Sequence, residues 1–137
     1  MSNFDIPDLK EVRRFGGHRG PTCDQVLYHL QERAVEHNVA PWCDKHEAAL
    51  VAYSPFGHGS FSDPHTPGGR LLKQIADEND ATSRQVALRF LLRWPFSFAL
   101  PKSSDEDHVV ENAGAGDLKL TEMQIALIDI SAQATMK

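Results

Sequence analysis

The sequence has few cysteines, no long apolar run and no basic run, and each absence excludes a class of protein. Cys23 and Cys43 are too few to hold a small fold together with disulfides, so we expect free, buried thiols. No apolar stretch reaches the roughly 20 residues that cross a bilayer, and the sequence from Met1 lacks the basic and apolar regions of a secretory signal. The formal charge of −5 comes from 19 acidic and 14 basic residues, which argues against nucleic acid or a membrane as partner. Together these features predict a cytoplasmic protein.

The histidines and cysteines do not predict a metal site. Cys43 and His46 have the Cys-x-x-His spacing of half a zinc site, but a second pair at ligand spacing is missing. His58 and His65 fall in a stretch rich in Gly, Ser and Pro, where solvated loop histidines are the ordinary case. We therefore expect none of these residues to be a metal ligand.

What the sequence does contain is an alternation of short apolar runs with longer stretches of helical period. This pattern is typical of strand-helix units around a parallel sheet, so the predicted fold class is α/β. The length of 137 residues suits one domain, residues 1–137. Strands are predicted at residues 24–30, 48–53 and 96–100, and helices at about 5–15, 32–46, 70–78, 82–94, 105–113 and 122–131.

Capping residues and prolines predict where several helices begin or break. Thr82 with Gln85, and Thr121 with Gln124, have the spacing of capping boxes. Ser104 is the predicted N-cap of the helix over residues 105–113. Pro41 is expected to interrupt the helix over residues 32–46.

Two helices and one loop carry further expectations. The first helix should bury Leu9, Val12 and Phe15 on one stripe. The last helix has more apolar residues than one face requires, so we expect it to pack tightly against its neighbours. Residues 57–69 are predicted to form a long loop, either a binding loop or lid or a disordered excursion.

Polar residues stand near the carboxyl ends of the three predicted strands, where parallel sheets bind ligands. They are Gln25, Tyr53 with Ser54, and Lys102 with Ser103 and Ser104. A lysine before a Ser-Ser helix start combines a cation with free backbone N–H groups, which suits a phosphate. The alternative interpretation is a solvated lysine beside an ordinary serine cap, and Tyr53 by itself fits a core aromatic equally well.

Read together, these segments resemble the carboxyl-terminal half of the aldo-keto reductase family. Ser2-Asn3-Phe4 is similar to the family's Gly-Val-Ser-Asn-Phe strand end, and Gln25-Val26-Leu27-Tyr28-His29 to its Asn-Gln-Val-x-Tyr-His strand. Residues 52–57, Ala-Tyr-Ser-Pro-Phe-Gly, resemble its Ala-Tyr-Ser-Pro-Leu-Gly segment, and residues 101–112 resemble its last cofactor segment. The resemblance implies a partial (β/α)8 TIM barrel, about the last three to four strand-helix units.

The same resemblance implies a cofactor, NADP(H), and a role for each matched residue. Ser2, Asn3 and Gln25 would bind the nicotinamide carboxamide, and Tyr53 would stack on the nicotinamide ring. Ser54, Phe56 and Gly57 would follow the pyrophosphate, Lys102, Ser103 and Ser104 would hold the adenosine 2′-phosphate, and Glu111 and Asn112 would contact the adenine end. Two positions depart from the pattern. Asp24 stands where the family often has Asn, and His108 stands where many members have an arginine against the 2′-phosphate, so NAD is also possible.

The family's acid-base residues, a Tyr with Asp, Lys and His, come from the first four strands, and no residue of this chain matches them. We therefore assign no catalytic residue and expect the chain alone to be a poor reductase of aldehydes or ketones. Three strands do not close a barrel, and their open edges favour self-association or pairing with an amino-terminal half in trans. The alternatives are an inactive nucleotide-binding or dimerising half-barrel, and a truncated relic.

Overall fold

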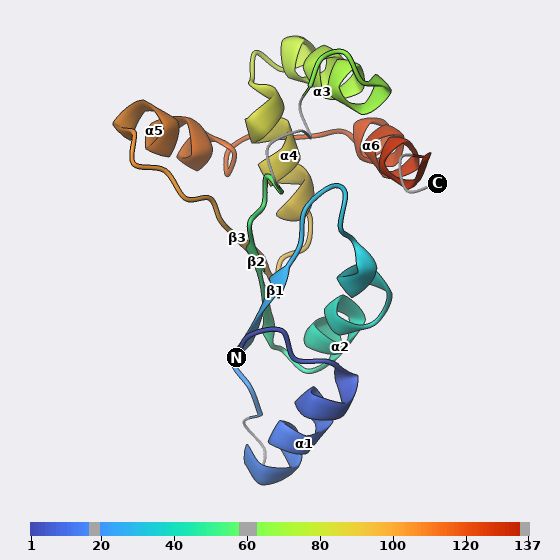
Figure 1. Cartoon of the computed structure of the whole chain (residues 1–137), viewed down its shortest axis with the longest axis vertical. Coiled ribbons are helices and arrows are strands. Elements are labelled where there is room, and N and C mark those ends of the chain that lie inside the picture. The colour runs from blue at the N-terminus through green and yellow to red at the C-terminus, as the bar shows by residue number, and fades with distance from the viewer. Residues whose placement is uncertain (17–19, 58–62, 135–137) are drawn as a thin grey trace.

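The structure is a computed structural model that describes residues 1–16, 20–57 and 63–134. Strands and helices alternate along it, as the sequence predicts (Figure 1). The elements are α1 (Ile6–Gly16), β1 (Cys23–Leu27), the 3-10 helix η2 (Ala34–His37), α2 (Val39–Lys45), β2 (Ala49–Tyr53), α3 (Pro67–Glu78), α4 (Ser83–Leu91), β3 (Ser97–Leu100), α5 (Glu106–Gly114) and α6 (Glu122–Ala134).

The three strands form one parallel sheet in the order β1-β2-β3, which confirms the α/β prediction. In the register, Leu27 pairs with Tyr53, and Tyr53 pairs with Leu100. The segment before α1 extends the sheet, because Ser2 forms a parallel bridge with Gln25. The carboxyl ends of the strands therefore lie side by side, and the segments that follow them start from one edge of the sheet.

Helices cover one face of this sheet and leave the other open. On the covered face, Val26, Leu50 and Ala52 belong to the same buried core as Cys43 of α2 and Phe90 of α4. On the opposite face, Leu27, Val51 and Tyr53 are half-buried, while Phe98 is 53% and Leu100 49% exposed. Figure 1 shows α2 along one side of the strands. The sheet is thus a layer with one helix-covered side.

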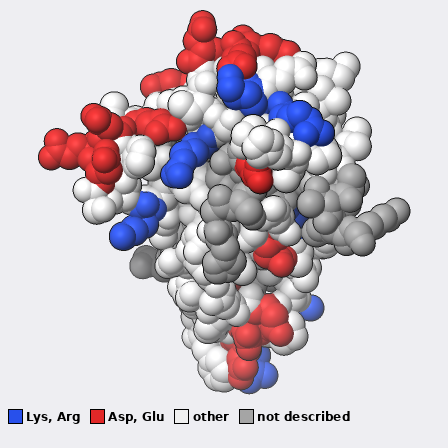
Figure 2. Space-filling model, turned by 45° about the horizontal axis from the view of Figure 1, so that its top comes forward, with Lys and Arg blue, Asp and Glu red and all other residues white. Residues whose placement is uncertain are grey.

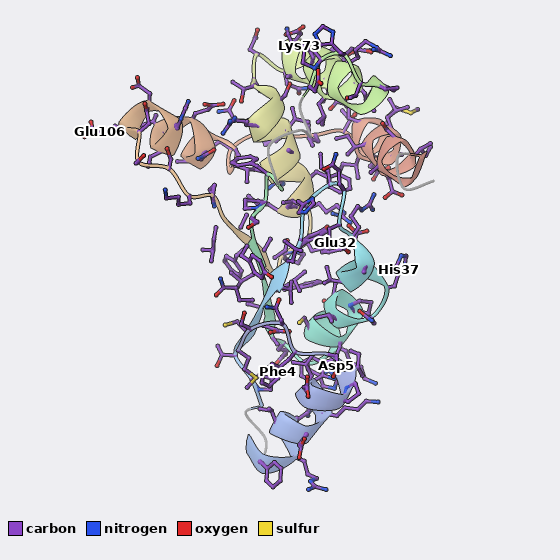
Figure 3. All side chains as sticks on the ribbon, viewed as in Figure 1. Phe4, Asp5, Glu32, His37, Lys73 and Glu106 are labelled. Carbon is purple, nitrogen blue, oxygen red and sulfur yellow. The ribbon has the colours of Figure 1, made fainter. Side chains whose placement is uncertain are left out.

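The capping signals place several helix starts correctly. Thr82 accepts from the Gln85 N–H while the Gln85 side chain accepts from the Thr82 N–H, so the first capping box is present. The same reciprocal pair joins Thr121 and Gln124. Asp5 accepts a 3.0 Å hydrogen bond from the Asp8 N–H, where the chain leaves the sheet and enters α1 (Figure 3).

Three boundary predictions were wrong. The region 32–46 is divided at Asn38 into η2 and α2, and Pro41 lies in the first turn of α2, where its missing N–H would have no helical partner. Asp105, not Ser104, caps α5, because its carboxylate accepts from the His108 N–H. The predicted loop 57–69 ends earlier, since Thr66 caps α3 at Pro67; residues 58–62, including His58, lie outside the described residues.

Two packing predictions were also wrong. Phe15 is 72% exposed, so only Leu9 of the expected stripe is fully buried. In α6, Ile128 is buried, but Met123, Leu127 and Ile130 are 69%, 40% and 66% exposed. These three residues recur at helical spacing on a face that no other described element covers. The apolar excess of this helix therefore reflects a second, open face.

The remaining sequence expectations concern thiols, metals and membranes. Both cysteines are free, with Cys43 buried and Cys23 half-buried. His46 Nδ1 lies 2.7 Å from the Trp42 carbonyl oxygen. Over the residues that the structure describes, no group of three or more His, Cys, Asp and Glu side chains is placed to hold a metal ion. None of the helices within the described ranges is long and apolar enough to cross a bilayer.

Candidate functional site

The first part of the candidate site lies where the amino-terminal segment pairs with β1. The Asn3 N–H donates to the Gln25 carbonyl at 2.8 Å, and the Ser2 hydroxyl donates to the same oxygen at 3.1 Å. Asn3 has a left-handed backbone with φ of 56°, a conformation that asparagine tolerates better than most residues. Ser2 and Asn3 are exposed and Gln25 is half-buried on the open face, so their polar groups gather beside the sheet.

On the covered face of the sheet, Asp24 holds the segment around Phe4 in place through a hydrogen bond. Asp24 is fully buried, and its Oδ1 accepts a 3.4 Å hydrogen bond from the Phe4 N–H. Its other oxygen, Oδ2, is buried without a hydrogen-bond partner among the described residues. Burial raises the pKa of Asp24 above its ordinary value of 3.8, against the Phe4 hydrogen bond and the terminal ammonium, which lower it. The position therefore favours a neutral carboxyl group.

The second part is the tight turn that follows β2. Tyr53 is half-buried on the same open face as Gln25, two residues further along the sheet. After it, Ser54 and Gly57 take left-handed φ values of 50° and 58°, and the Gly57 N–H donates to the Ser54 carbonyl at 2.8 Å. A Cβ atom on Gly57 would stand 3.1 Å from Cε1 of His29. The turn therefore needs glycine for its backbone and for its contact with the His29 ring.

The third part is the segment between β3 and α5. Lys102 and Ser104 are exposed, and Ser103 forms a local turn in which its hydroxyl accepts from the Asp105 N–H at 3.1 Å. Because Asp105 caps α5, the His108 N–H is already bonded and the first turn is acidic, with Glu106 and Asp107. Figure 2 shows acidic side chains at the left edge, where α5 lies in Figure 1, with basic side chains beside them. The sequence predicted free backbone N–H groups at the start of α5 that would bind a phosphate, and the Asp105 cap leaves fewer of them free.

The last predicted residues, Glu111 and Asn112, lie where α5 meets the start of α4. The Thr82 hydroxyl donates to Glu111 Oε1 at 2.6 Å, and Gln85 Nε2 donates to the Glu111 carbonyl at 2.9 Å. Glu111 therefore ties the two helices together in this structure. Asn112 Oδ1 is buried and has no hydrogen-bond partner in the described part of the chain. An unpaired buried acceptor is costly, and a ligand that donates a hydrogen bond would satisfy it.

The predicted residues thus form two groups rather than one. Gln25 and Tyr53 lie on the open face of neighbouring strands, and Ser2 and Asn3 are bonded to the Gln25 carbonyl beside them. The second group, Glu111 and Asn112, lies where α5 contacts the start of α4. Two segments start from the carboxyl ends of the strands, between the two groups: the turn over residues 54–57, which follows β2, and the segment over residues 102–104, which follows β3. His108 is exposed on α5. Such an arrangement fits an extended molecule with a polar head, a phosphate-bearing middle and a base.

No side chain of this arrangement is placed as a proton donor. Tyr28 is completely buried, and its hydroxyl donates to Glu36 Oε1 at 2.6 Å while accepting from Arg93 Nη1 at 2.6 Å. Burial raises the pKa of Tyr28 well above its ordinary value of 10. Since a catalytic acid must reach its substrate and release a proton near working pH, Tyr28 has a structural role.

Sequence reasoning missed Arg84. This residue, in the first turn of α4, places its guanidinium carbon 5.1 Å from the centre of the Phe56 ring. Arg84 belongs to none of the cofactor segments matched by motif, and the only available signal was a basic residue just after a capping threonine. The contact brings a cation beside the turn that follows β2.

Comparison with known proteins identifies the family. A model of the aldo/keto reductase family matches residues 1–133. This chain belongs to the aldo/keto reductase family. It is 28% identical over 129 residues to methylglyoxal reductase YeaE of Escherichia coli, covering 94% of this chain and 45% of that protein. It is 29% identical to glyoxal reductase of Bacillus subtilis, over 94% of this chain and 44% of that enzyme.

Solved aldo-keto reductase structures share its fold. A thermostable aldo-keto reductase in complex with the inhibitor epalrestat has a TM-score of 0.84 and 35% identity, over 95% of this chain and 46% of that one. An aldo/keto reductase from Klebsiella pneumoniae in complex with NADP and acetate has a TM-score of 0.83 and 30% identity, over 94% and 46%. The chain therefore spans about half the length of the relatives that it matches, as an α/β part of the aldo-keto reductase barrel.

Proposed function

We propose that this chain is the carboxyl-terminal, cofactor-binding half of an aldo-keto reductase barrel and that it binds NADP(H). The observation that carries the proposal is that Gln25, in the middle of β1, and Tyr53, at the end of β2, lie on the same open face, with Ser2 and Asn3 bonded to the Gln25 carbonyl. Amide and hydroxyl groups beside an aromatic ring suit a carboxamide-bearing ring, and the bound group would supply hydride chemistry. The related Klebsiella protein was solved with NADP, which supports the choice of ligand.

The remaining residues extend the proposal along the cofactor. Ser54, Phe56 and Gly57 would follow the pyrophosphate, Lys102, Ser103 and Ser104 would face the 2′-phosphate, and Asn112 Oδ1 would accept from the adenine amino group. Because Glu111 bonds to Thr82, its adenine contact would require that bond to open. The chain supplies no acid-base residue, so reduction of an aldehyde or ketone would require the amino-terminal half, in the same protein or in trans.

Titration of the purified chain with NADPH and NADH, followed by cofactor fluorescence, tests this proposal. The expected result is saturable binding that Tyr53→Ala weakens by about tenfold, since base–aromatic stacking is worth about 1–3 kcal/mol. The matched control is Phe15→Ala, which removes an exposed ring on α1, away from the strand ends, and should leave binding unchanged. Absence of binding, or equal loss in both variants, would contradict the proposal and favour a relic.

We infer a second candidate function, self-association through the open face of the sheet. The face presents uncharged side chains only, namely Cys23, Gln25, Leu27, Ala49, Val51, Tyr53, Phe98 and Leu100. Two such faces meet without charge repulsion, although the chain as a whole carries −5. The chain covers 46% of the solved barrel, so two copies supply nearly its length.

Sedimentation equilibrium tests the second candidate. The expected result is a dimer that Phe98→Lys dissociates, because a lysine would place a charge on the otherwise uncharged open face. Val110→Lys, at a position 72% exposed on α5, is the control and should leave the dimer intact. A wild-type monomer that binds an added amino-terminal half would instead support complementation in trans.

A further inference from the structure

We propose that Arg84 is a further cofactor-binding residue, one that provides the cation for the phosphate at the adenosine end and thereby sets the preference for NADPH over NADH. The inference rests on the proposed cofactor function and adds a residue to which the family resemblance assigned no cofactor contact. Three observations support it. They are the position of Arg84 over Phe56, the absence of an ion pair to its guanidinium among the described residues, and the acidic residues around the segment over residues 102–108.

The first observation is position. The Arg84 guanidinium lies over Phe56, in the turn that would follow the pyrophosphate. Two residues near Arg84 reach the other part of the site, because Thr82, the N-cap of α4, and Gln85, in its first turn, both bond to Glu111. Arg84 therefore stands between the turn after β2 and the adenine end of α5, which is where a phosphate linked to the adenosine would lie.

The second observation is that this guanidinium remains available. Arg33 and Arg93 are both paired with Glu36, Arg33 at 2.5 Å and Arg93 at 2.8 Å, and are largely buried. Arg84, by contrast, is exposed and forms no ion pair within the described residues. A guanidinium held over an aromatic ring keeps its edge N–H donors free, and their planar fork matches two phosphate oxygens.

The third observation is the shortage of positive charge on α5. His108 stands in its first turn beside Asp105, Glu106 and Asp107, and the Asp105 carboxylate already accepts the His108 N–H. Lys102 is the cation of that segment. A 2′-phosphate brought near these carboxylates needs a second cation on its other side, and Arg84 provides one from α4.

Cofactor titrations of the folded 137-residue chain test the assignment. Arg84→Gln is expected to raise the Kd for NADPH by about tenfold and to change the Kd for NADH by less than twofold, since only NADPH carries the 2′-phosphate. Arg84→Lys keeps the charge and should recover part of the preference. The smaller probes adenosine 2′,5′-bisphosphate and 5′-AMP should show the same contrast.

Arg14→Gln is the matched control, because the Arg14 guanidinium also lies over a neighbouring ring, 4.9 Å from the centre of Phe15, on the distant helix α1 (Figure 1). It should leave both affinities unchanged. If wild type binds NADPH but Arg84→Gln keeps the same preference, the role of Arg84 is overturned while the proposed function stands. If wild type binds neither cofactor nor the bisphosphate, both are overturned.

Discussion

The hydroxyl of Tyr28 donates a 2.6 Å hydrogen bond to the carboxylate of Glu36, and this bond joins the segment after β1 to the short helix η2. Two arginines complete the arrangement: Arg33 bonds to both Glu36 oxygens, and Arg93 bonds to Glu36 and to the Tyr28 hydroxyl. Arg33 also pairs with Asp129 of α6. The Glu36 carboxylate therefore binds three side chains, and Arg33 extends the arrangement to α6.

Glu36→Gln is expected to destabilise the chain by about 3 kcal/mol, because it leaves Arg33, only 6% exposed, without its main counter-charge. Urea unfolding followed by circular dichroism measures this. Lys73→Gln is the control, since the Lys73–Asp77 pair on α3 is about 60% exposed (Figure 3) and should contribute less than about 1 kcal/mol. Equal effects of the two substitutions would show that the buried network contributes no more than a surface pair.

The same network predicts a loss of stability in acid. Burial raises the pKa of Glu36, but hydrogen bonds from the two arginines and Tyr28 outweigh it and hold that pKa below its ordinary value of 4.5. The unfolded chain then binds more protons than the folded one, so this contribution is present above pH 4.5 and disappears as the pH falls through the lowered pKa. Unfolding experiments between pH 3 and pH 6 should show this slope in wild type and a smaller one in Glu36→Gln.

Asp24→Asn should stabilise the chain increasingly as the pH rises. Burial raises the pKa of Asp24, so the folded chain holds a proton that the unfolded chain releases above its ordinary pKa of 3.8. This contribution to stability therefore decreases as the pH rises from 3.8 through the raised pKa in wild type, and asparagine removes that loss. Comparison of urea midpoints at pH 4 and pH 8 measures it. A change in midpoint of the same size at pH 4 and at pH 8 would contradict the explanation.

Gly57→Ala should cost about 1–2 kcal/mol of stability and weaken NADPH binding. Alanine at a φ of 58° is strained, and its Cβ would press on the His29 ring. Gly116→Ala provides the comparison, because its Cβ would meet its nearest neighbour, the Ala113 oxygen, at 3.4 Å and its φ is not left-handed. Thermal unfolding and cofactor titration of both variants measure the two effects. Tolerance of alanine at position 57 would show that the turn does not need glycine.

Cys43 should react with a thiol reagent far more slowly than Cys23. Burial raises the pKa of the Cys43 thiol to about 11, which leaves little thiolate at pH 8. Cys23 is half-buried on the open face. Labelling of the monomeric chain with a chromogenic disulfide at pH 8 should therefore modify one thiol quickly, and Cys23→Ser should abolish that fast phase. A fast phase that survives in Cys23→Ser would place Cys43 in solvent.

Local sequence patterns predicted the element types well because their causes are local. Thr82 and Thr121 cap helices together with glutamines three residues away. The predicted strand over residues 24–30 is correct only as far as Leu27, where β1 ends, and Tyr28, His29 and Leu30 beyond it are all buried. Ser104 failed for the opposite reason. Ser104 and Asp105 are neighbouring polar residues that could each be the N-cap of α5, and the course of the chain after β3 makes Asp105 the N-cap.

The sequence by itself determined the α/β class, the three parallel strands and the family motifs with their spacing, because hydrophobic period, capping and turn chemistry act over a few residues. Only the tertiary structure decided which charged side chains are paired within the chain and which can still bind a ligand. Glu36 pairs with Arg93, 57 positions away, in addition to its local partner Arg33, Glu111 accepts from Thr82, and the Arg84 guanidinium lies over Phe56. These outcomes depend on contacts between residues 20 to 60 positions apart, and packing sets such contacts.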